Sequence, residues 1–491
     1  MKIKLVIGLD IGTTGVKAVA FDYKGKHHAI AEELITTYYP EEGYAEQNPV
    51  EVEAAARRVM RQVIDELDQS EFEIAATGIG CAMHSLICVD EQGEALSNML
   101  IWSDGRASKQ AEALIHGNGS KIYARTGTPI HPMTPLVKLI WMRENKFPPY
   151  KEAAYFMTMK EYLTYRWFNM RVVDYAMASS TGMFDVKNLT WDKESLELAG
   201  ISEEQLSEVV EPTRKLTGLR AEIAEEFGIS DELPIIIGSA DGQLANLGSG
   251  ATSTGEVNIS AGTSGAIRQF INGAPINKKM ETFTYAFSAD TSIIGGPTNN
   301  GGIVLQWLKE LIDYDGSYTE LISEAEGVAR GADGIIFLPY INGERAPLWN
   351  QKAKGNFYGL SIEHTKKQLV RALLEGIAFN IYQINQSLES LAGKPKKITV
   401  NGGLSQSLLW SQILADILGE DLYLSETHHN AAWGAAWTAL VAIEEVPSFS
   451  AIKENLPKEK KVTANMDAHA EYMKIFKKYA KLKEAVSVFF A

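Results

Sequence analysis

GLDIGTTGVKAVAFD, residues 8–22, has apolar, partly β-branched runs on either side of a Gly-Thr-Thr-Gly turn. Such runs around a glycine-containing turn predict a β-hairpin. Glycine lets the backbone approach a ligand closely, the hydroxyls of Thr13 and Thr14 can donate hydrogen bonds, and Asp10 can hold a hydrated Mg²⁺. Lys17 adds a nearby positive charge. Taken alone, an ordinary hairpin whose glycines serve only the turn explains this stretch at least as well.

A second Gly-Thr turn lies in GEVNISAGTSGAIRQF, residues 255–270. This stretch repeats the order of apolar strand, turn and apolar strand, with Gly262 and Thr263 in the turn. The repetition predicts an internal duplication, although two β-hairpins can also resemble each other by chance. Two such turns on duplicated halves could hold a triphosphate from opposite sides.

Helical and strand-like segments alternate along the chain. Apolar residues recur at helical spacing over residues 52–67 and again over 369–388, and strand-like runs cover 76–90 and 233–238. This alternation predicts an α/β fold with buried strands.

The stretch 242–255 is uncharged and rich in Gly, Ser and Thr, and it follows a buried strand. That composition is typical of a connection between domains. We therefore expect a first domain over residues 1–245 and a second over 246–491.

Asp241 stands just beyond the carboxyl end of the strand predicted at 233–238. Phosphoryl transfer to an alcohol needs a carboxylate that orients the hydroxyl and accepts its proton. A lone Asp before Gly is more often a turn former. Its place beside the predicted inter-domain connection favours the general base, because clefts between domains shield reactions from water.

Two glycine pairs precede predicted helices. Gly301 and Gly302 come before IVLQWLKEL, and Gly402 and Gly403 come before LSQSLLWSQILADILG. A base or ribose can lie on bare backbone at such a corner, and a helix N-terminus favours anions. Close packing at the start of the helix explains each pair equally well.

Met83, His84 and Ser85 interrupt an apolar strand-like run. A buried histidine is most often a hydrogen-bonded part of the core. A polyol hydroxyl is the alternative partner for this imidazole.

The composition excludes several classes of protein. Hydrophobic residues make up 45% and charged residues 22%, as in soluble globular chains, and the net charge of −15 gives no overall attraction for nucleic acid or anionic lipid. Cys81 and Cys88 match neither a zinc site nor a disulfide framework, and no apolar run could form a signal peptide or cross a membrane. We expect a cytoplasmic protein without nucleic-acid or membrane partners.

Other cofactor motifs are missing from the sequence. It contains no GxxxxGK[ST], no GxGxxG at the start of a βαβ unit, and no HExxH or CxxC. The adjacent His428 and His429 are expected to have a surface or capping role, because neighbouring side chains point apart.

The features above together resemble the FGGY family of carbohydrate kinases over almost the whole chain. MTPLVKLIWMREN at 133–145 and GNFYGLSIEHTKKQLVRALLE at 355–375 fit the two signatures of that family. The resemblance implies two duplicated ribonuclease-H-like domains, as in the actin, Hsp70 and sugar kinase superfamily, on either side of a catalytic cleft. It also implies ATP and Mg²⁺ as cofactors, and a homodimer, which is common among relatives.

The same resemblance implies roles for individual residues. It makes Asp241 the catalytic base and places Asp10 near Mg²⁺. The phosphates are expected at Thr13, Thr14, Lys17, Gly262 and Thr263; the adenosine at Gly302, Gln306, Gly402, Gly403 and Ser407; and the sugar at Met83, His84, Trp102, Asp104 and Asp241. Many relatives have Arg directly after the Asp where this chain has Gly105 and then Arg106, and the position of Ser407 varies.

Four stretches are similar to the gluconate kinases of that family: residues 82–85, 125–133, 262–268 and 343–350. This similarity implies phosphorylation of a sugar acid, D-gluconate, with a xylulose or other pentulose kinase as the alternative. Glycerol is disfavoured because glycerol kinases show Arg-Glu where this chain has Met-His. A buried carboxylate needs charged or multiple donors, and His84, Lys160 or Arg345 are the candidates.

Two rival functions belong to other classes. A nucleotide-driven switch of the same superfamily would bind ATP without phosphorylating a sugar, and a non-catalytic sugar sensor would lack turnover. The sugar-kinase signatures argue against the first, and the complete set of Asp10, Thr13, Thr263 and Asp241 argues against the second.

Overall fold

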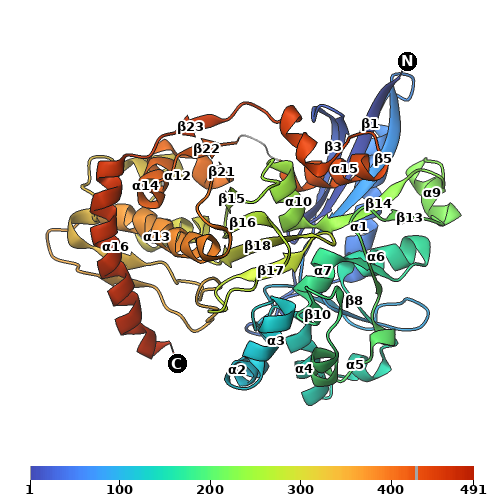
Figure 1. The fold of residues 1–491 in the computed structure, drawn as a ribbon, viewed down its shortest axis with the longest axis horizontal. Helices are drawn as coiled ribbons and strands as arrows, with labels where there is room; N and C mark the ends of the chain where they lie inside the picture. The colour runs from blue at the N-terminus through green and yellow to red at the C-terminus, as the bar shows by residue number, and fades with distance from the viewer. Residues whose placement is uncertain (1, 426–428, 491) are drawn as a thin grey trace.

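The computed structural model describes residues 2–425 and 429–490, and Figure 1 shows two α/β halves side by side. Of the pair His428 and His429, His428 lies outside the described residues. None of the described helices is both long and apolar enough to span a bilayer.

The first half is built on a six-stranded sheet. Its strand order is β13 (Lys215–Leu216), β14 (Ile235–Ala240), β5 (Phe72–Cys81), β1 (Ile3–Ile11), β2 (Gly15–Asp22) and β3 (His27–Leu34). β1, β2 and β3 pair antiparallel, whereas β5 and β14 run parallel to β1. The predicted N-terminal hairpin is therefore confirmed, and its apolar residues are buried on both faces of the sheet.

The second half repeats this plan. Its strand order is β17 (Phe283–Ala286), β18 (Thr291–Thr298), β16 (Gly265–Asn272), β15 (Glu256–Ala261), β21 (Lys397–Asn401), β22 (Leu422–Leu424) and β23 (Lys460–Val462). The β15–β16–β18 meander is antiparallel, β21 and β22 run parallel to β15, and β23 is antiparallel. Apart from the added β17, order and direction match the first sheet, which confirms the predicted duplication.

Long amphipathic helices pack against the sheets. α1 (Pro49–Asp65) starts at Asn48, whose side chain accepts from the Val50 N–H, and it packs on β2 and β3. α13 (Lys366–Ala392) starts with a capping box at Thr365 and ends before Gly393. Both helices cover the segments where the sequence shows helical spacing.

Additional elements surround this duplicated framework. In the first half they are β4 (Glu46–Gln47), β6 (Ile87–Val89), β7 (Met99–Leu100), α2 (Ser108–His116), α3 (Gly119–Thr126), α4 (Pro135–Glu144), α5 (Pro148–Glu152), β8 (Tyr155–Met157), α6 (Met159–Phe168), β9 (Val172–Asp174), α7 (Tyr175–Ser180), β10 (Phe184–Asp185), β11 (Thr190–Trp191), α8 (Lys193–Ala199), β12 (Glu208–Val210) and α9 (Ala221–Phe227). In the second they are α11 (Gly302–Leu311), α12 (Tyr318–Ser323), β19 (Ile336–Leu338), β20 (Asn356–Tyr358), α14 (Leu408–Leu418) and α16 (Met466–Val486).

Two equivalent helices cross where the halves meet. α10 (Asp241–Gly248) follows β14, and α15 (Asn430–Ala442) follows β22, so they are counterparts in the duplication. α15 nevertheless packs on β1 and β5 of the first sheet as well as on α10, and Figure 1 shows it beside the blue N-terminal strands. A Cβ at Gly8 would lie 1.9 Å from the Ala432 carbonyl oxygen, so this contact requires glycine.

The connection between the halves lies within the predicted stretch 242–255 but is shorter than that stretch. Half of the stretch 242–255 is helical, because α10 covers it to Gly248, and β15 begins only at Glu256. The domain boundary predicted between residues 245 and 246 therefore falls inside α10. Burial of this apolar stretch against α15 favours a helix over a loop.

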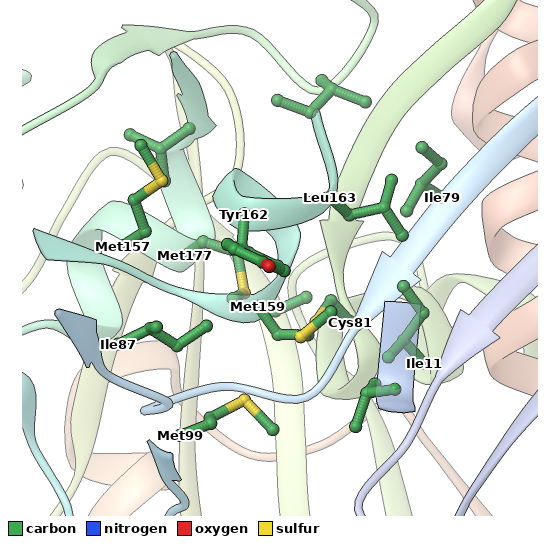
Figure 2. Packing of buried hydrophobic residues seen from close by; sticks show 14 of the residues in the cluster. Ile11, Ile79, Cys81, Ile87, Met99, Met157, Met159, Tyr162, Leu163 and Met177 are labelled. Atoms are coloured by element: carbon green, nitrogen blue, oxygen red, sulfur yellow. The ribbon is translucent and has the colours of Figure 1, made fainter. Parts of the chain in front are cut away.

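The strand predicted over 76–90 is interrupted. β5 ends at Cys81, and the chain turns at His84, which has a left-handed φ of 68°, before β6 begins. Figure 2 shows Cys81 close to Met159, in the buried cluster of the first half that also contains Ile11 and Met99. Cys81 is thus a buried core residue with a free thiol.

Candidate active site

A cavity of about 330 Å³ lies where the two halves face each other. The first half contributes Thr13, Thr14, Ala82, Met83, His84, Trp102, Met133 and Asp241 to its wall, and the second contributes Ser260, Ser264, Gly265, Ala266, Arg268, Phe283, Tyr285, Pro297 and Arg345. Both Gly-Thr turns therefore meet at one cavity, as the duplication predicts.

Asp241 is placed by the junction of β14 and α10. Its Oδ1 accepts from the Gly242 N–H at 2.7 Å, in the first turn of the helix, where a negative charge is favoured. Burial raises the pKa of its carboxyl, while Arg268 and, below the site, Lys160 act to lower it. The carboxylate is thus held at the cavity by its backbone, as a proton acceptor requires.

Asp10 lies on β1, opposite Lys17 of β2, and is near enough to Asp241 for the two charges to interact. Burial, and then the negative charge of Asp241, raise the pKa of Asp10 to about 7. Its Oδ1 is buried and has no hydrogen-bond partner in the part of the chain that the structure describes. A carboxylate oxygen left without a protein donor suits a hard cation such as Mg²⁺, which is usually bound by one or two carboxylates and by phosphate oxygens.

The raised pKa predicts that Asp10→Asn stabilises the metal-free protein at pH 8. The folded state holds the Asp10 proton up to about pH 7, whereas the unfolded chain loses it near pH 4, so ionised Asp10 destabilises the fold increasingly across that window. The melting temperature of Asp10→Asn should therefore exceed that of the wild type at pH 8, with the gap narrowing at pH 5. A gap independent of pH would contradict the assignment.

His84 is held by two buried groups. Its Nδ1 lies 2.8 Å from the Ser180 carbonyl oxygen, and its own carbonyl oxygen accepts from Lys138 Nζ at 2.7 Å. Burial and the charge of Lys138 lower the pKa of His84 to about 3, so the imidazole is neutral. Because Nδ1 must carry the proton to donate to a carbonyl, Nε2 is an acceptor and suits a substrate hydroxyl.

Trp102 joins the two halves of the cavity wall. Its Nε1 donates to Thr13 Oγ1 at 2.9 Å, and the Arg345 guanidinium lies 4.8 Å from its ring centroid. This contact fixes the indole beside the first turn and orients an arginine from the opposite half.

Two arginines give the cavity wall an excess of positive charge. Arg268 on β16 lies close enough to Asp241 to affect its pKa, and Arg345 lies beside Trp102. Neither forms an ion pair with a carboxylate of the described residues, and the Nε of each has no hydrogen-bond partner there. Local sequence pattern does not single out Arg268, although it lies in the stretch 262–268 that resembles gluconate kinases.

The second Gly-Thr turn is enclosed by both glycine pairs. The Gly302 N–H donates to the Gly262 carbonyl oxygen at 2.7 Å and the Ile303 N–H to the Thr263 carbonyl oxygen at 3.0 Å. Gly402, with φ of 84°, approaches Ala261 so closely that a Cβ would lie 2.6 Å from its carbonyl oxygen. The three segments predicted for the nucleotide therefore converge at the ends of β15 and β21.

The other residues predicted to contact the nucleotide are on α11, before α14 and, for Lys17, on β2 of the first half. Gln306 is on α11, where its side chain contacts Glu310 at 2.9 Å, and Ser407 caps α14 by accepting from the Trp410 N–H. Gly403 opens a short 3₁₀ turn before that helix. Lys17 pairs with Glu32 at 3.2 Å and does not line the cavity.

The structure does not bring Asp104 and Lys160 to the cavity. Asp104 accepts from Arg106 Nε and from the Ala45 N–H at 2.8 Å, so it anchors a loop behind Trp102. Lys160 is fully buried and donates to Asp174 and to the Ser239 carbonyl oxygen, each at 2.7 Å. Of the three residues expected to bind a carboxylate, His84 is neutral, Lys160 is paired with Asp174, and Arg345 lines the cavity.

Family models match both halves of the chain. The N-terminal domain of the FGGY family of carbohydrate kinases matches residues 5–248, and the C-terminal domain matches residues 257–443. The chain belongs to the FGGY family of carbohydrate kinases. The family resemblance and the duplicated fold expected from the sequence are therefore confirmed.

Individual members of the FGGY family match over nearly the whole chain. A gluconokinase from Bacillus subtilis (strain 168) is 36% identical over 498 residues, covering 98% of this chain and 96% of the relative. A crystal structure of gluconate kinase from Lactobacillus acidophilus superposes with a TM-score of 0.95 at 32% identity over 98% of each chain. A ligand-bound xylulose kinase from the same organism gives the same TM-score and identity over 99% of this chain and 98% of its own.

Proposed function

We propose that this FGGY carbohydrate kinase transfers the γ-phosphate of ATP to the 6-hydroxyl of D-gluconate. The carrying observation is the cavity wall, where Arg268 and Arg345, which form no ion pair with any described residue, share the wall with one carboxylate, Asp241. A buried cation without an ion pair is costly, and a sugar acid supplies a further negative charge to the cavity. The similarity to a gluconokinase at 36% identity supports the same substrate.

In the proposed mechanism, Asp241 accepts the proton of the 6-hydroxyl while that oxygen attacks the γ-phosphorus of ATP. The bond between the γ-phosphorus and the β,γ-bridging oxygen breaks on the opposite side, and ADP leaves with the electron pair. The His84 imidazole accepts a hydrogen bond from a substrate hydroxyl, and Trp102 and Tyr285 bound the cavity. The Gly-Thr turns at Thr13 and Ser264 present backbone and hydroxyl donors to the phosphates from opposite sides. The carboxylate of gluconate, at the opposite end of the substrate from the 6-hydroxyl, lies toward Arg345, because Arg268 stands beside Asp241.

Asp10 is the residue that would hold Mg²⁺, because its Oδ1 has no donor among the described residues. When bound, the ion neutralises phosphate charge. Gly262 and Thr263 extend the phosphate site beside Ser264, and the residues proposed to contact the adenosine are Gly302, Gln306, Gly402, Gly403 and Ser407. Lys17, which pairs with Glu32 outside the cavity wall, stays a predicted phosphate contact. A cytoplasmic homodimer without nucleic-acid or membrane partners remains a prediction.

The first experiment is ADP release by the purified protein with ATP and Mg²⁺. Gluconate, xylulose, ribulose, glycerol and no acceptor are tested separately. Turnover with gluconate at least tenfold above the other acceptors is expected. Equal turnover in every tube would indicate the nucleotide switch, and none in any tube would indicate the sugar sensor.

A xylulose or other pentulose kinase is the second candidate. The observation that favours it is the equal similarity to the xylulose kinase structure from Lactobacillus acidophilus. Preferred turnover of xylulose in the same panel would keep the mechanism at Asp241 but replace the substrate.

The site predicts that His84→Ala weakens gluconate binding about tenfold or more and leaves ATP binding unchanged, because Nε2 is a buried acceptor for a sugar hydroxyl. Calorimetric titration with each ligand measures both affinities. His84→Asn is the matched second variant, since Asn tolerates the left-handed φ of 68° better than Ala. Equal loss of both affinities would remove His84 from the sugar site.

A further inference from the structure

Glu344 is a buried carboxylate between the sugar cavity and the nucleotide turn. Its side chain is fully buried, and no ion pair to it exists among the described residues. Five donors surround it: the Thr298 hydroxyl at 2.7 Å, the N–H groups of Asn299 at 3.0 Å and Arg345 at 2.8 Å, and the side-chain amides of Asn300 at 3.1 Å and Asn380 at 2.8 Å. All five groups can donate, so these hydrogen bonds favour the ionised carboxylate, while burial acts in the opposite direction and raises its pKa.

Three of these donors, in residues 298–300, are close in sequence to the segment predicted to bind the nucleotide. Residues 298–300 run directly into Gly301 and Gly302 at the start of α11. Gly302 in turn donates to the carbonyl oxygen of Gly262, in the second Gly-Thr turn, at 2.7 Å. Any displacement of this segment therefore moves the backbone predicted to carry the phosphates.

The other donor leads to the sugar. Arg345 follows Glu344 directly and lines the cavity, and its Nη2 donates to the Thr298 carbonyl oxygen at 3.3 Å. Asn300 holds the same two segments together a second time, because its Nδ2 donates to the Gly343 carbonyl oxygen at 2.7 Å and its Oδ1 accepts from the Asn342 N–H at 3.1 Å. The arginine and the nucleotide turn are thus tied to one carboxylate.

We propose that Glu344 is a positioning residue that couples the two ligands, so that sugar acid and nucleotide bind more tightly together than separately. This inference rests on the proposed function. A ligand that orders Arg345 also orders residues 298–302 through Glu344, and the second ligand then has less conformational freedom to remove. Buried hydrogen-bond networks transmit such ordering because an unpaired member is costly.

Glu344→Gln tests the coupling with little change of volume. In either orientation, the NH₂ group of Gln faces at least two donors. It meets the N–H groups of Asn299 and Arg345 if it replaces Oε1, and the side-chain donors of Thr298, Asn300 and Asn380 if it replaces Oε2. Calorimetry gives the Kd of gluconate with and without saturating Mg²⁺-ADP, which binds without turnover. In the wild type we expect the nucleotide to lower the Kd of gluconate about fivefold or more. In Glu344→Gln, the ratio of the gluconate Kd without nucleotide to the Kd with nucleotide should be less than about two.

Glu375→Gln is the matched control in the same half. Glu375 is also buried and accepts from Arg371, Tyr472 and the Gly331 N–H, but it touches neither the cavity wall nor residues 298–302. It should keep the wild-type factor even if its melting temperature falls. If Glu344→Gln does not fold, Thr298→Val, which removes one donor, should lower the factor by about half or more.

Three results would overturn the proposed coupling. They are a gluconate Kd of the wild type that the nucleotide leaves unchanged, a folded Glu344→Gln variant that keeps the wild-type decrease in Kd, and a Glu375→Gln variant that loses that decrease to the same extent. Failure of the proposed function is seen separately, because the wild type would then not turn over gluconate. In that case the titration uses the panel sugar that supports turnover, and the same three results decide.

Discussion

Asp241→Asn is expected to lower kcat about 10²- to 10⁴-fold, the contribution typical of a general base, while leaving the affinities for gluconate and ATP within about threefold of the wild type. Asn has the shape of Asp and still accepts from the Gly242 N–H, but it cannot take the hydroxyl proton. Single-turnover measurement of sugar phosphate separates this chemical step from product release.

Asp416→Asn is the matched control for that loss. Asp416 is buried in the second half, where it accepts from Gln412 and the Asn465 N–H, outside the cavity wall. It should retain near-wild-type turnover. Near-normal turnover of Asp241→Asn would show that Asp241 is not the base. If Asp241→Asn instead lost its cooperative melting transition, Asp241 would have a structural role.

The second large effect is expected from replacing Arg268 or Arg345 by Gln. A buried charge pair between protein and ligand is typically worth about 2–4 kcal/mol. Each variant should therefore lose about 30- to 1,000-fold in kcat/KM for gluconate. The loss is expected in KM more than in kcat for Arg345, because Arg345 is held beside Trp102 and away from Asp241.

D-Glucitol provides the comparison that isolates the carboxylate, because it has a hydroxymethyl group in its place. An arginine that binds the carboxylate should lose little activity on glucitol, so that the preference for gluconate over glucitol falls with the substitution. Equal loss on both substrates would instead assign that arginine to the transferring phosphoryl group. Arg125→Gln is the control, because it removes a partly exposed ion pair with Asp192 outside the cavity. It should change neither the activity on gluconate nor the activity on glucitol.

Much of the fold is predictable from local pattern. The apolar runs around the turn at residues 12–15 specify a hairpin, helical spacing specifies α1 and α13, and the repeated Gly-Thr turn indicates the duplication that the two sheet orders confirm. These features depend on neighbours in the chain, so periodicity and turn chemistry are sufficient to predict them.

Segment 242–255 shows where local pattern fails. Its glycines and its lack of charge suggest a linker, yet its first half is the helix α10, because α15 from nearly 200 residues later covers it. The position of α15 on the sheet of the opposite half also has no local signal. Packing between distant segments decides both, and it overrides propensity.

The duplicated α/β plan, the Gly-Thr turns and the carboxylate at the end of β14 can be predicted from local sequence, since each depends on residues close together in the chain. The charges that face the cavity depend instead on the tertiary structure. It brings Arg268 and Arg345 to the wall, makes His84 a neutral acceptor, and occupies Asp104 and Lys160 with buried partners. The physical reason is that ionisation and hydrogen-bond capacity depend on burial and on partners far away in sequence, which no local pattern records.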